Sequence, residues 1–286
     1  NTYIQKLDSL IKSKESAKLV AILNPLHAAD IAEIIEKLEK KDAKYLFGLI
    51  HDDEKAAAII IEIEDDKRTK ILDNFSANEI VDDVIDKLAS DDAAEVIGEF
   101  SKDKKEEVLS LIKDKKIVKN INDLLSYPKN TAGSLMEKEL IKVNENWHTF
   151  QCLKEIRKQA NNVKNIYTIY VVNDENKLQG LISLRSLLLT EKSTAIKNII
   201  NINIISIKSS EENGNIANMM QKYDLVTLPV VDNHGKLLGR ITIDDAMDVA
   251  KEVAEKDYQM ASGISEDVES NDTIMNLTRA RLPWLL

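Results

Sequence analysis

Closely spaced carboxylates are the residues of this sequence best suited to do chemistry. Asp245 and Asp248 are three positions apart, so they would share one face of a helix. Asp224 just precedes a strand of the same segment, and Glu212 lies one helix earlier. Carboxylates that each contribute one or two oxygen atoms to a largely hydrated ion suit Mg²⁺. The sequence therefore predicts a magnesium site built from these four residues.

A second acidic cluster lies in the first hundred residues. Asp91, Asp92 and Glu95 fall within about one helical turn and would share a face. A divalent cation would relieve the repulsion between them, but the same residues also suit a helix N-terminus and a solvated surface. Both interpretations stay open from the sequence alone. No role is predicted for the neighbouring carboxylates Asp82, Asp83 and Asp86.

The elements that must position the first cluster form an internal repeat. The stretch Val226–Asp248 reads as an apolar strand, a polar turn, a second strand and the acidic start of a helix, and Tyr167–Leu189 repeats it 59 positions earlier (226 − 167). Seven positions are identical between the copies, which indicates a true repeat. A strand–turn–strand–helix unit repeated at this distance resembles a tandem pair of cystathionine-β-synthase (CBS) motifs, a regulatory module rather than a catalytic one.

The resemblance to CBS motifs implies a nucleotide site. Gly239, Thr242 and Asp245 have the G-x-x-[ST]-x-x-D spacing with which many CBS motifs hold an adenine nucleotide such as ATP. The hydroxyl would contact phosphate and the carboxylate would contact ribose. Where a carboxylate is needed, the first copy has Ser186 instead, so one site is expected rather than two.

Further strands and helices are expected around the two hairpins. The helix at Trp147–Ala160 would direct Phe150, Leu153 and Ile156 inward. The helix at Asn215–Tyr223 would direct Met219 and Met220 inward. The expected elements are a strand at Leu140–Val143, a helix at Trp147–Ala160, a strand at Ile204–Ile207 and a helix at Asn215–Tyr223.

The first hundred residues read as a string of short helical phrases. Each phrase opens on polar residues and closes on an apolar one, at intervals of 12 or 13 residues. Such a phrase holds about 2–3 helical turns, too short to be stable alone, so the helices must stack as a superhelical array. The closing residues are Leu38, Ile50, Ile63, Phe75, Leu88, Phe100 and Ile112.

Composition excludes several classes of function. The net charge of −10 argues against binding to nucleic acid. The single cysteine, Cys152, indicates a reducing compartment, and the scattered histidines have no cysteine partners for a zinc site. We find no catalytic His/Asp/Ser constellation and no Gly-rich phosphate loop, so no enzyme is predicted. No apolar run approaches the ~20 residues of a membrane span, although RARLPWLL (279–286) is typical of the cytoplasmic shoulder of one as well as of an amphipathic tail.

Together these features resemble the cytosolic part of the MgtE magnesium channels and transporters. The order of the parts carries the resemblance more than any single motif. The matching stretches are HAADIAEIIEKL (27–38), DDAAEVIGEF (91–100), YPKNTAGSLM (127–136), LPVVD (228–232), TIDDAMD (242–248) and RARLPWLL.

The resemblance implies a fold class, a partner and a location. It implies an α+β multidomain chain at the cytoplasmic face of a bacterial cell membrane, forming a homodimer through its CBS pairs and acting on its own transmembrane domain. The expected domains are an all-α superhelical N domain at 1–128, CBS motifs at 129–198 and 199–252, and at 253–286 a connecting (plug) helix leading into the first transmembrane helix.

The resemblance also implies a Mg²⁺-sensing gate, in which bound Mg²⁺ favours a compact form that closes the pore. The implied metal positions are Asp91, Glu95, Glu212, Asp224, Asp245, Asp248 and Asp257. Gly214, Val253 and Lys256 stand where the family usually has acidic residues, so we expect weaker or fewer sites there, with Lys256 in an ion pair that replaces a metal bridge. The alternative is an adenine-nucleotide sensor that regulates a transporter or an enzyme.

Overall fold

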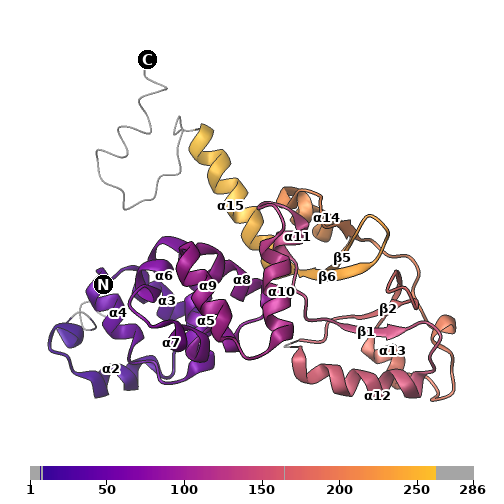
Figure 1. The fold of residues 1–286 in the computed structure, drawn as a ribbon, viewed down its shortest axis with the longest axis horizontal. Helices are drawn as coiled ribbons and strands as arrows, with labels where there is room; N and C mark the ends of the chain where they lie inside the picture. Colours follow the sequence, from indigo (N-terminus) through magenta and orange to yellow (C-terminus); the bar gives the residue numbers. More distant parts are fainter. Residues whose placement is uncertain (1–6, 8, 164, 262–286) are drawn as a thin grey trace. The chain divides into compact units, whose positions relative to one another are not determined.

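The computed structural model describes residue 7, residues 9–163 and residues 165–261, and it divides the chain into two units. The first unit runs to Ser126 and the second begins at Tyr127 (Figure 1). The predicted RARLPWLL segment and the expected connecting helix beyond Ala261 lie outside the described residues. Within the described ranges, no helix combines the length and the apolar character that crossing a membrane requires.

The first unit is an array of short helices in two rows. In one row α3, α5, α7 and α9 pack in succession, and in the other α4, α6, α8 and α10 do so. The predicted stacking of short helices is therefore confirmed. The bounds are α2 Ser16–Leu23, α3 Ala28–Glu36, α4 Lys40–Phe47, α5 Asp53–Glu62, α6 Asp65–Leu72, α7 Ala77–Asp83, η1 Ile85–Lys87, α8 Ser90–Glu99, α9 Lys102–Leu111 and α10 Lys115–Leu125.

The helices begin and end near the polar and apolar residues that open and close the predicted phrases. Ile63 and Phe100 directly follow α5 and α8, and both are buried. The carboxylate of Asp52 accepts a hydrogen bond from the Lys55 amide at 3.1 Å, which caps α5. At α8, however, the N-cap is Ala89, and Asp91 lies in the first turn rather than at the cap.

Lysine side chains link helices of the array by hydrogen bonds to carbonyl groups at helix ends. Lys55 Nζ donates to the carbonyls of Leu23 and Asn24 at 3.0 and 2.9 Å, and Lys104 Nζ donates to Leu72 at 2.9 Å. The last carbonyls of a helix have no partner within it, so these bonds satisfy groups that the short helices leave open. Each bond joins residues 31 or 32 positions apart in the array.

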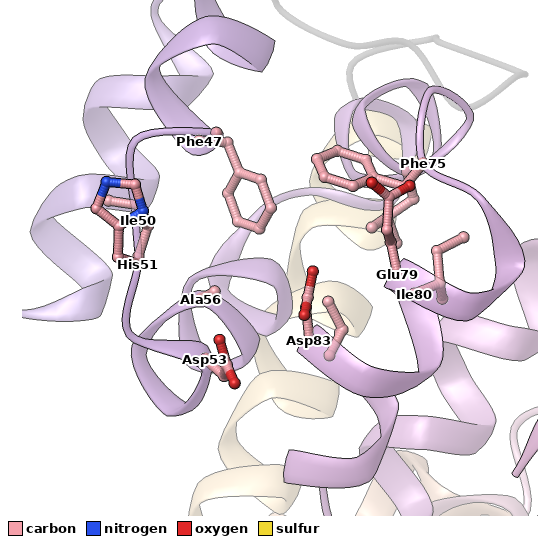
Figure 2. A pocket seen from close by; sticks show the side chains of 12 residues that line it. Phe47, Ile50, His51, Asp53, Ala56, Phe75, Glu79, Ile80 and Asp83 are labelled. Carbon is pink, nitrogen blue, oxygen red and sulfur yellow. The ribbon is translucent and has the colours of Figure 1, made fainter. Parts of the chain in front are cut away.

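A cavity of about 270 Å³ opens within the first unit, between α4, α5, α6 and α7 (Figure 2). Phe47, at the end of α4, and Phe75, just after α6, both line it. Their ring centroids are 5.8 Å apart and their planes meet at 86°, an edge-to-face pair. The aromatic pair thus forms an apolar wall of this cavity.

The second unit contains two three-stranded sheets of the same topology, β1-β2-β3 and β4-β5-β6. In each sheet the first pair of strands is parallel and the hairpin pair is antiparallel. The repeat is confirmed residue by residue: Val171 lies opposite Gly180 and Val230 opposite Gly239. The bounds are α11 Ala132–Leu135, β1 Ile141–Asn144, α12 Thr149–Gln159, η2 Ala160–Asn162, β2 Ile169–Val172, β3 Leu178–Ile182, α13 Leu184–Leu189, η3 Ile196–Asn198, β4 Ile207–Lys208, η4 Asn213–Asn215, α14 Ile216–Lys222, β5 Thr227–Val231, β6 Leu237–Thr242 and α15 Ile243–Ala261.

Two details of the expected elements are wrong. The strand expected at Ile204–Ile207 is β4, only Ile207–Lys208, because pairing with β5 begins at Ile207. In α12, Phe150 is 58% exposed, whereas Cys152 and Ile156 are buried in the core. Helical periodicity explains the second error, since the buried face runs through Thr149, Cys152 and Ile156 and Phe150 lies one position off it.

Candidate metal and nucleotide sites

Asp245 lies in the first turn of α15, directly after β6. Its Oδ2 atom accepts hydrogen bonds from the amide of Thr242, at 3.1 Å, and from the Thr242 hydroxyl. Burial raises the pKa of the Asp245 carboxyl to about 6. Thr242 and Asp245, two residues of the predicted nucleotide site, are therefore hydrogen-bonded to each other. Burial makes the negative charge of the Asp245 carboxylate unfavourable.

Gly239 has a packing role that the sequence motif does not reveal. A Cβ atom placed there would lie 2.7 Å from the Glu137 carbonyl oxygen and 2.8 Å from the Met136 sulfur. The same segment exchanges backbone hydrogen bonds with Arg240, and the Arg240 guanidinium forms a buried ion pair with Glu137, Nε to Oε2, at 2.7 Å. The glycine is needed here because protein backbone approaches it closely.

The remaining predicted metal residues of the second unit are exposed. Asp248 and Asp257 lie on α15, and the pKa of the Asp248 carboxyl is raised by burial, although Lys251 opposes the shift. Asp224 lies in a turn after α14 with φ of 50°, and Glu212 is the N-cap of η4. Both η4 and α14 pack against α15, so the segments that carry these carboxylates are neighbours.

The contact between η4 and α15 forms without two of the expected carboxylates. A Cβ atom at Gly214 would lie 4.0 Å from the Val253 methyl group, in ordinary van der Waals contact. Lys256 forms an ion pair within α15, with its Nζ 2.5 Å from Oε1 of Glu252 one turn earlier, and whether it replaces a metal bridge stays a prediction. At these positions, therefore, the chain has small or apolar contacts and a charge pair along one helix.

In the first unit, Asp91 and Glu95 both lie on α8, four positions apart. Asp91 is half-buried and its Oδ1 atom is shielded from solvent, whereas Glu95 is exposed. The carboxylate of Glu95 lies 2.6 Å from the Arg68 guanidinium of α6. Any cation bound by Glu95 would therefore compete with Arg68.

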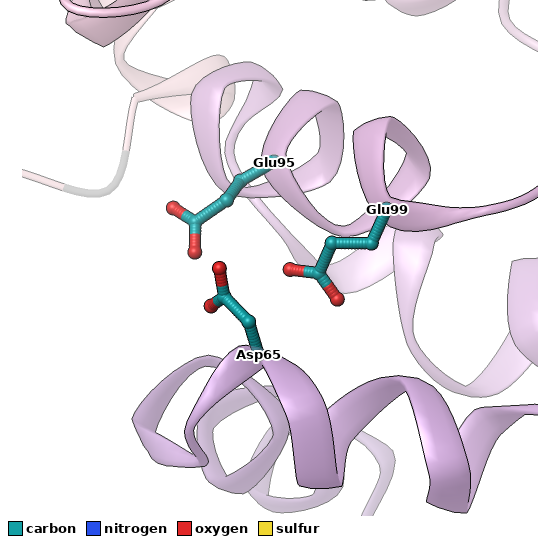
Figure 3. A group of neighbouring side chains, drawn as sticks. All are labelled: Asp65, Glu95 and Glu99. Carbon is teal, nitrogen blue, oxygen red and sulfur yellow. The ribbon is translucent and has the colours of Figure 1, made fainter. Parts of the chain in front are cut away.

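Arg68 is the centre of a carboxylate cluster that the sequence analysis missed. Asp65, Glu95 and Glu99 bring ligand atoms within 4.8 Å of one another, the one such group of three among the described residues (Figure 3). The Arg68 side chain, 1% exposed, forms ion pairs with all three. Burial raises the pKa of Glu99 even though Arg68 opposes the shift. The cluster thus already holds an internal cation, and it includes only one of the seven predicted metal residues.

Comparisons with known proteins match the order of these units. The model of the MgtE intracellular N domain matches residues 26–130, and that of the CBS domain matches residues 132–191 and 196–252. The magnesium transporter MgtE of Enterococcus faecalis is 35% identical over 167 residues, covering 58% of this chain and 36% of the relative. That of Thermus thermophilus is 26% identical over 286 residues, covering 98% and 63%. The chain thus spans less than two thirds of the length of these relatives.

One solved structure covers residues of both units. The crystal structure of the cytosolic domain of the Mg²⁺ channel MgtE in complex with ATP superposes with a TM-score of 0.76 at 25% identity, covering 86% of this chain and 99% of that one. The predicted α+β class, a helical region followed by a CBS pair, is confirmed. The relatives are magnesium transporters, which agrees with the prediction that the chain is not an enzyme.

Proposed function

The chain belongs to the MgtE family, and from that premise we propose that it is the Mg²⁺-sensing regulatory part of a magnesium transporter at the cytoplasmic face of a bacterial membrane. Mg²⁺ bound by its carboxylates would favour a compact form that closes the pathway of the transmembrane domain. The proposed ligands are Asp91, Glu95, Glu212, Asp224, Asp245, Asp248 and Asp257.

The observation that carries this proposal is the electrostatic state of α15. Burial raises the pKa of both Asp245 and Asp248, so their negative charges are incompletely compensated in the metal-free chain. Hard oxygen ligands on adjoining segments fit Mg²⁺, which keeps most of its waters and needs few protein ligands. A cation at this face would relieve an unfavourable negative charge.

Several weak sites acting together can supply the free energy for a gate. Shifting a two-state equilibrium from 1:99 to 99:1 takes about 5.5 kcal/mol of differential binding. Each Mg²⁺ contributes only through its difference in affinity between the two forms. The Gly214–Val253 contact and the Lys256–Glu252 pair support fewer bound ions along α15 here than in relatives with acidic residues at these positions.

We also propose a homodimer formed through the CBS pairs. Large apolar side chains remain exposed on two helices that follow the hairpins: Leu188 and Leu189 on α13 are 66% and 75% exposed, and Met247 on α15 is 58% exposed. Exposed apolar groups of this size favour a protein interface. A second copy of the chain would cover them.

A nucleotide sensor is the second candidate function, favoured by the ATP complex of a relative. The Thr242 hydroxyl and the Asp245 carboxylate fit a phosphate and a ribose hydroxyl, but their mutual hydrogen bond must open first. Calorimetry with ATP should then give one site per chain, and Asp245→Ala should abolish it. An absence of heat with ATP, ADP and AMP would leave the pair of CBS motifs as a scaffold only.

Calorimetry with Mg²⁺ tests the principal function. We expect saturable binding in the millimolar range or below, and a loss of sites in a variant with both Asp245→Asn and Asp248→Asn. The matched control, Asp174→Asn with Asp232→Asn, removes two carboxylates from the hairpin turns and should leave the Mg²⁺ isotherm unchanged. Equal isotherms for the two double variants would contradict the assignment of α15 as a metal face.

A further inference from the structure

Residues 130–133 form a strap that pairs with residues 209–213. The strap lies shortly after Ser126, where the first unit ends. Within it, Thr131 pairs with the proposed metal ligand Glu212 in an antiparallel bridge. The backbone at a proposed ligand is therefore paired with the chain that leaves the first unit.

Backbone hydrogen bonds in both directions hold the strap in place. The first residues of α11 donate two of them, because their N–H groups have no partner within that short helix. Another is donated back to Asn130, whose φ of 65° is a left-handed conformation that asparagine adopts more readily than most residues. The bonds run from the amides of Ala132, Gly133 and Asn213 to the carbonyls of Glu211, Ser209 and Asn130, at 2.8, 2.9 and 3.0 Å respectively.

The Tyr127 ring packs directly on the strap. A Cβ atom at Gly133 would lie 2.3 Å from Cδ1 of Tyr127, so glycine leaves the room that the ring needs. The Lys138 ammonium lies 5.8 Å from the centre of the same ring, within the range of a cation–π interaction. The Thr131 hydroxyl donates to the Pro128 carbonyl at 2.8 Å. These contacts fix the strap to the residues that precede it.

The segment paired with the strap leads to the proposed metal face of α15. Glu212 is the N-cap of η4, and η4 packs against α15, which carries Asp245 and Asp248. A Mg²⁺ ion held by these carboxylates would restrain the same backbone that the strap restrains. Two events that order one segment favour each other, because the second event has less left to order.

We propose that the strap positions Glu212 for Mg²⁺, and that bound Mg²⁺ in turn tightens the strap. The inference rests on the proposed Mg²⁺-sensing function and adds a backbone route from the metal face to the chain that leaves the first unit. The strap contributes no ligand of its own, so its members act as positioning residues. Since the coupling is reciprocal, the strap and Mg²⁺ strengthen each other by the same factor.

A calorimetric Mg²⁺ titration of the whole chain with Ala132→Pro tests the proposal. Ala132 is the first residue of α11 and follows the extended Thr131 (φ −112°, ψ 158°), and proline accepts both conditions. Proline lacks the N–H that donates to Glu211, and its Cδ atom takes the place of that hydrogen bond. We expect the Kd for Mg²⁺ to rise about fivefold, the factor that corresponds to one net hydrogen bond.

The matched control is Lys40→Pro in the first unit. Lys40 is likewise the first residue of its helix, α4, and follows the extended Glu39 (φ −66°, ψ 150°). This variant should leave the Kd for Mg²⁺ unchanged. If Ala132→Pro does not fold by circular dichroism, Gly133→Ala replaces it and should raise the Kd in the same direction by displacing the Tyr127 ring. Its control is Gly48→Ala, where the new Cβ atom meets carbonyl oxygens only at 3.4 and 3.7 Å.

Hydrogen exchange, measured by NMR, supplies a second readout. In the metal-free chain, Ala132→Pro should speed exchange of the Asn213 amide, because its acceptor is no longer held in place. In the unaltered chain, saturating Mg²⁺ should slow exchange of the Gly133 amide about fivefold, in line with the reciprocal coupling. The Leu181 amide, which donates to the Asn201 carbonyl at 2.9 Å, is the internal control and should not respond to Mg²⁺.

An unchanged Kd in a folded strap variant, or exchange of the Gly133 amide that does not respond to Mg²⁺, would overturn the proposal. The double variant Asp245→Asn with Asp248→Asn separates this failure from failure of the proposed function. If the double variant loses Mg²⁺ sites while the strap variant keeps the unaltered Kd, the metal face stands and the strap fails. If the double variant keeps every site, the metal face fails and the strap with it.

Discussion

At the scale of single residues, the carboxyl group of Asp245 is the most informative. Its pKa in the folded chain is about 6, above the value of 3.8 for an unperturbed aspartate, because burial disfavours its charge. The folded state therefore binds this proton more tightly than the unfolded state does. The resulting stabilisation is fully present below about pH 4 and is lost as the pH rises through about 6.

Asp245→Asn should accordingly stabilise the metal-free chain at pH 7.5, by up to about 3 kcal/mol. Asparagine retains an oxygen that can accept from Thr242, so the helix start is preserved. Urea unfolding in the presence of a chelator measures the effect. The gain should disappear at pH 4. Asp232→Asn is the control with the opposite sign, since hydrogen bonds from the Lys236 and His234 amides lower the pKa of Asp232. A gain for Asp245→Asn that is independent of pH would contradict this explanation.

Gly239 provides a second prediction. Gly239→Ala should destabilise the chain by about 1–3 kcal/mol, because its Cβ atom would meet the backbone of Glu137 at 2.7 Å. The matched control is Gly98→Ala within α8, where a Cβ atom would touch only Leu125 at 3.5 Å and helix propensity favours alanine. The midpoint of urea unfolding should fall for the first variant and stay or rise for the second; equal midpoints would show that the segment at Met136 yields without cost.

Residue types and spacing predicted which carboxylates could matter, but not their partners. The G-x-x-T-x-x-D motif located Asp245 but could not reveal that Thr242 donates hydrogen bonds to it. A nucleotide site and a hydrogen bond between the two residues require the same residue types at the same spacing. Glu95 was predicted as a metal ligand without its ion-pair partner Arg68. Arg68 lies on another helix, 27 positions earlier in the sequence. Contacts distant in sequence leave no local pattern.

At the scale of elements, the cluster around Arg68 joins α6 to α8. One guanidinium neutralises part of three carboxylates, so the pair of helices carries a net charge of about −2 at this point. Arg68→Met should destabilise the chain by about 3 kcal/mol near neutral pH, since Glu99 would remain half-buried without its cation. The loss should shrink as the pH falls and Glu99 becomes protonated.

Thermal unfolding between pH 4.5 and 7.5 measures this effect. Lys87→Met is the control, because its partly exposed pair with Asp53, at 3.8 Å, should contribute less than about 1 kcal/mol. If both variants have the same unfolding temperature at every pH, the ion pairs of the cluster do not stabilise the fold. If Arg68→Met gains stability from Mg²⁺ that the unaltered chain does not, the three carboxylates would act as a metal site once the guanidinium is removed.

The sequence predicted elements better than their edges. Intervals of 12 or 13 residues located the stacked helices because each short helix must bury one apolar side. The seven identical positions in the two hairpin segments predicted where both sheets lie. The start of β4 was wrong because Ile204 and Ile207 look alike in an apolar run, and only pairing with β5 distinguishes them. Phe150 was predicted to be buried because its side chain is large and apolar. It lies one position away from the buried face of α12, which runs through Thr149, Cys152 and Ile156.

At the scale of the whole molecule, the central claim is that Mg²⁺ joins the two units into a more compact form. The proposed ligands belong to both units: Asp91 and Glu95 to the first, and Glu212, Asp224, Asp245, Asp248 and Asp257 to the second. Without Mg²⁺ the like charges would keep the units apart. Exposed charges separated by more than a Debye length of ~8 Å are largely screened, so only carboxylates close to a bridging ion should affect the change.

Small-angle X-ray scattering of the chain over a Mg²⁺ titration tests this claim most directly. We predict that the radius of gyration falls as Mg²⁺ rises to millimolar concentrations, that Asp91→Asn is slightly more compact without Mg²⁺ and closes less with it, and that Asp82→Asn matches the unaltered chain. A radius of gyration that is unchanged by Mg²⁺, or the same response in Asp91→Asn and Asp82→Asn, would contradict it.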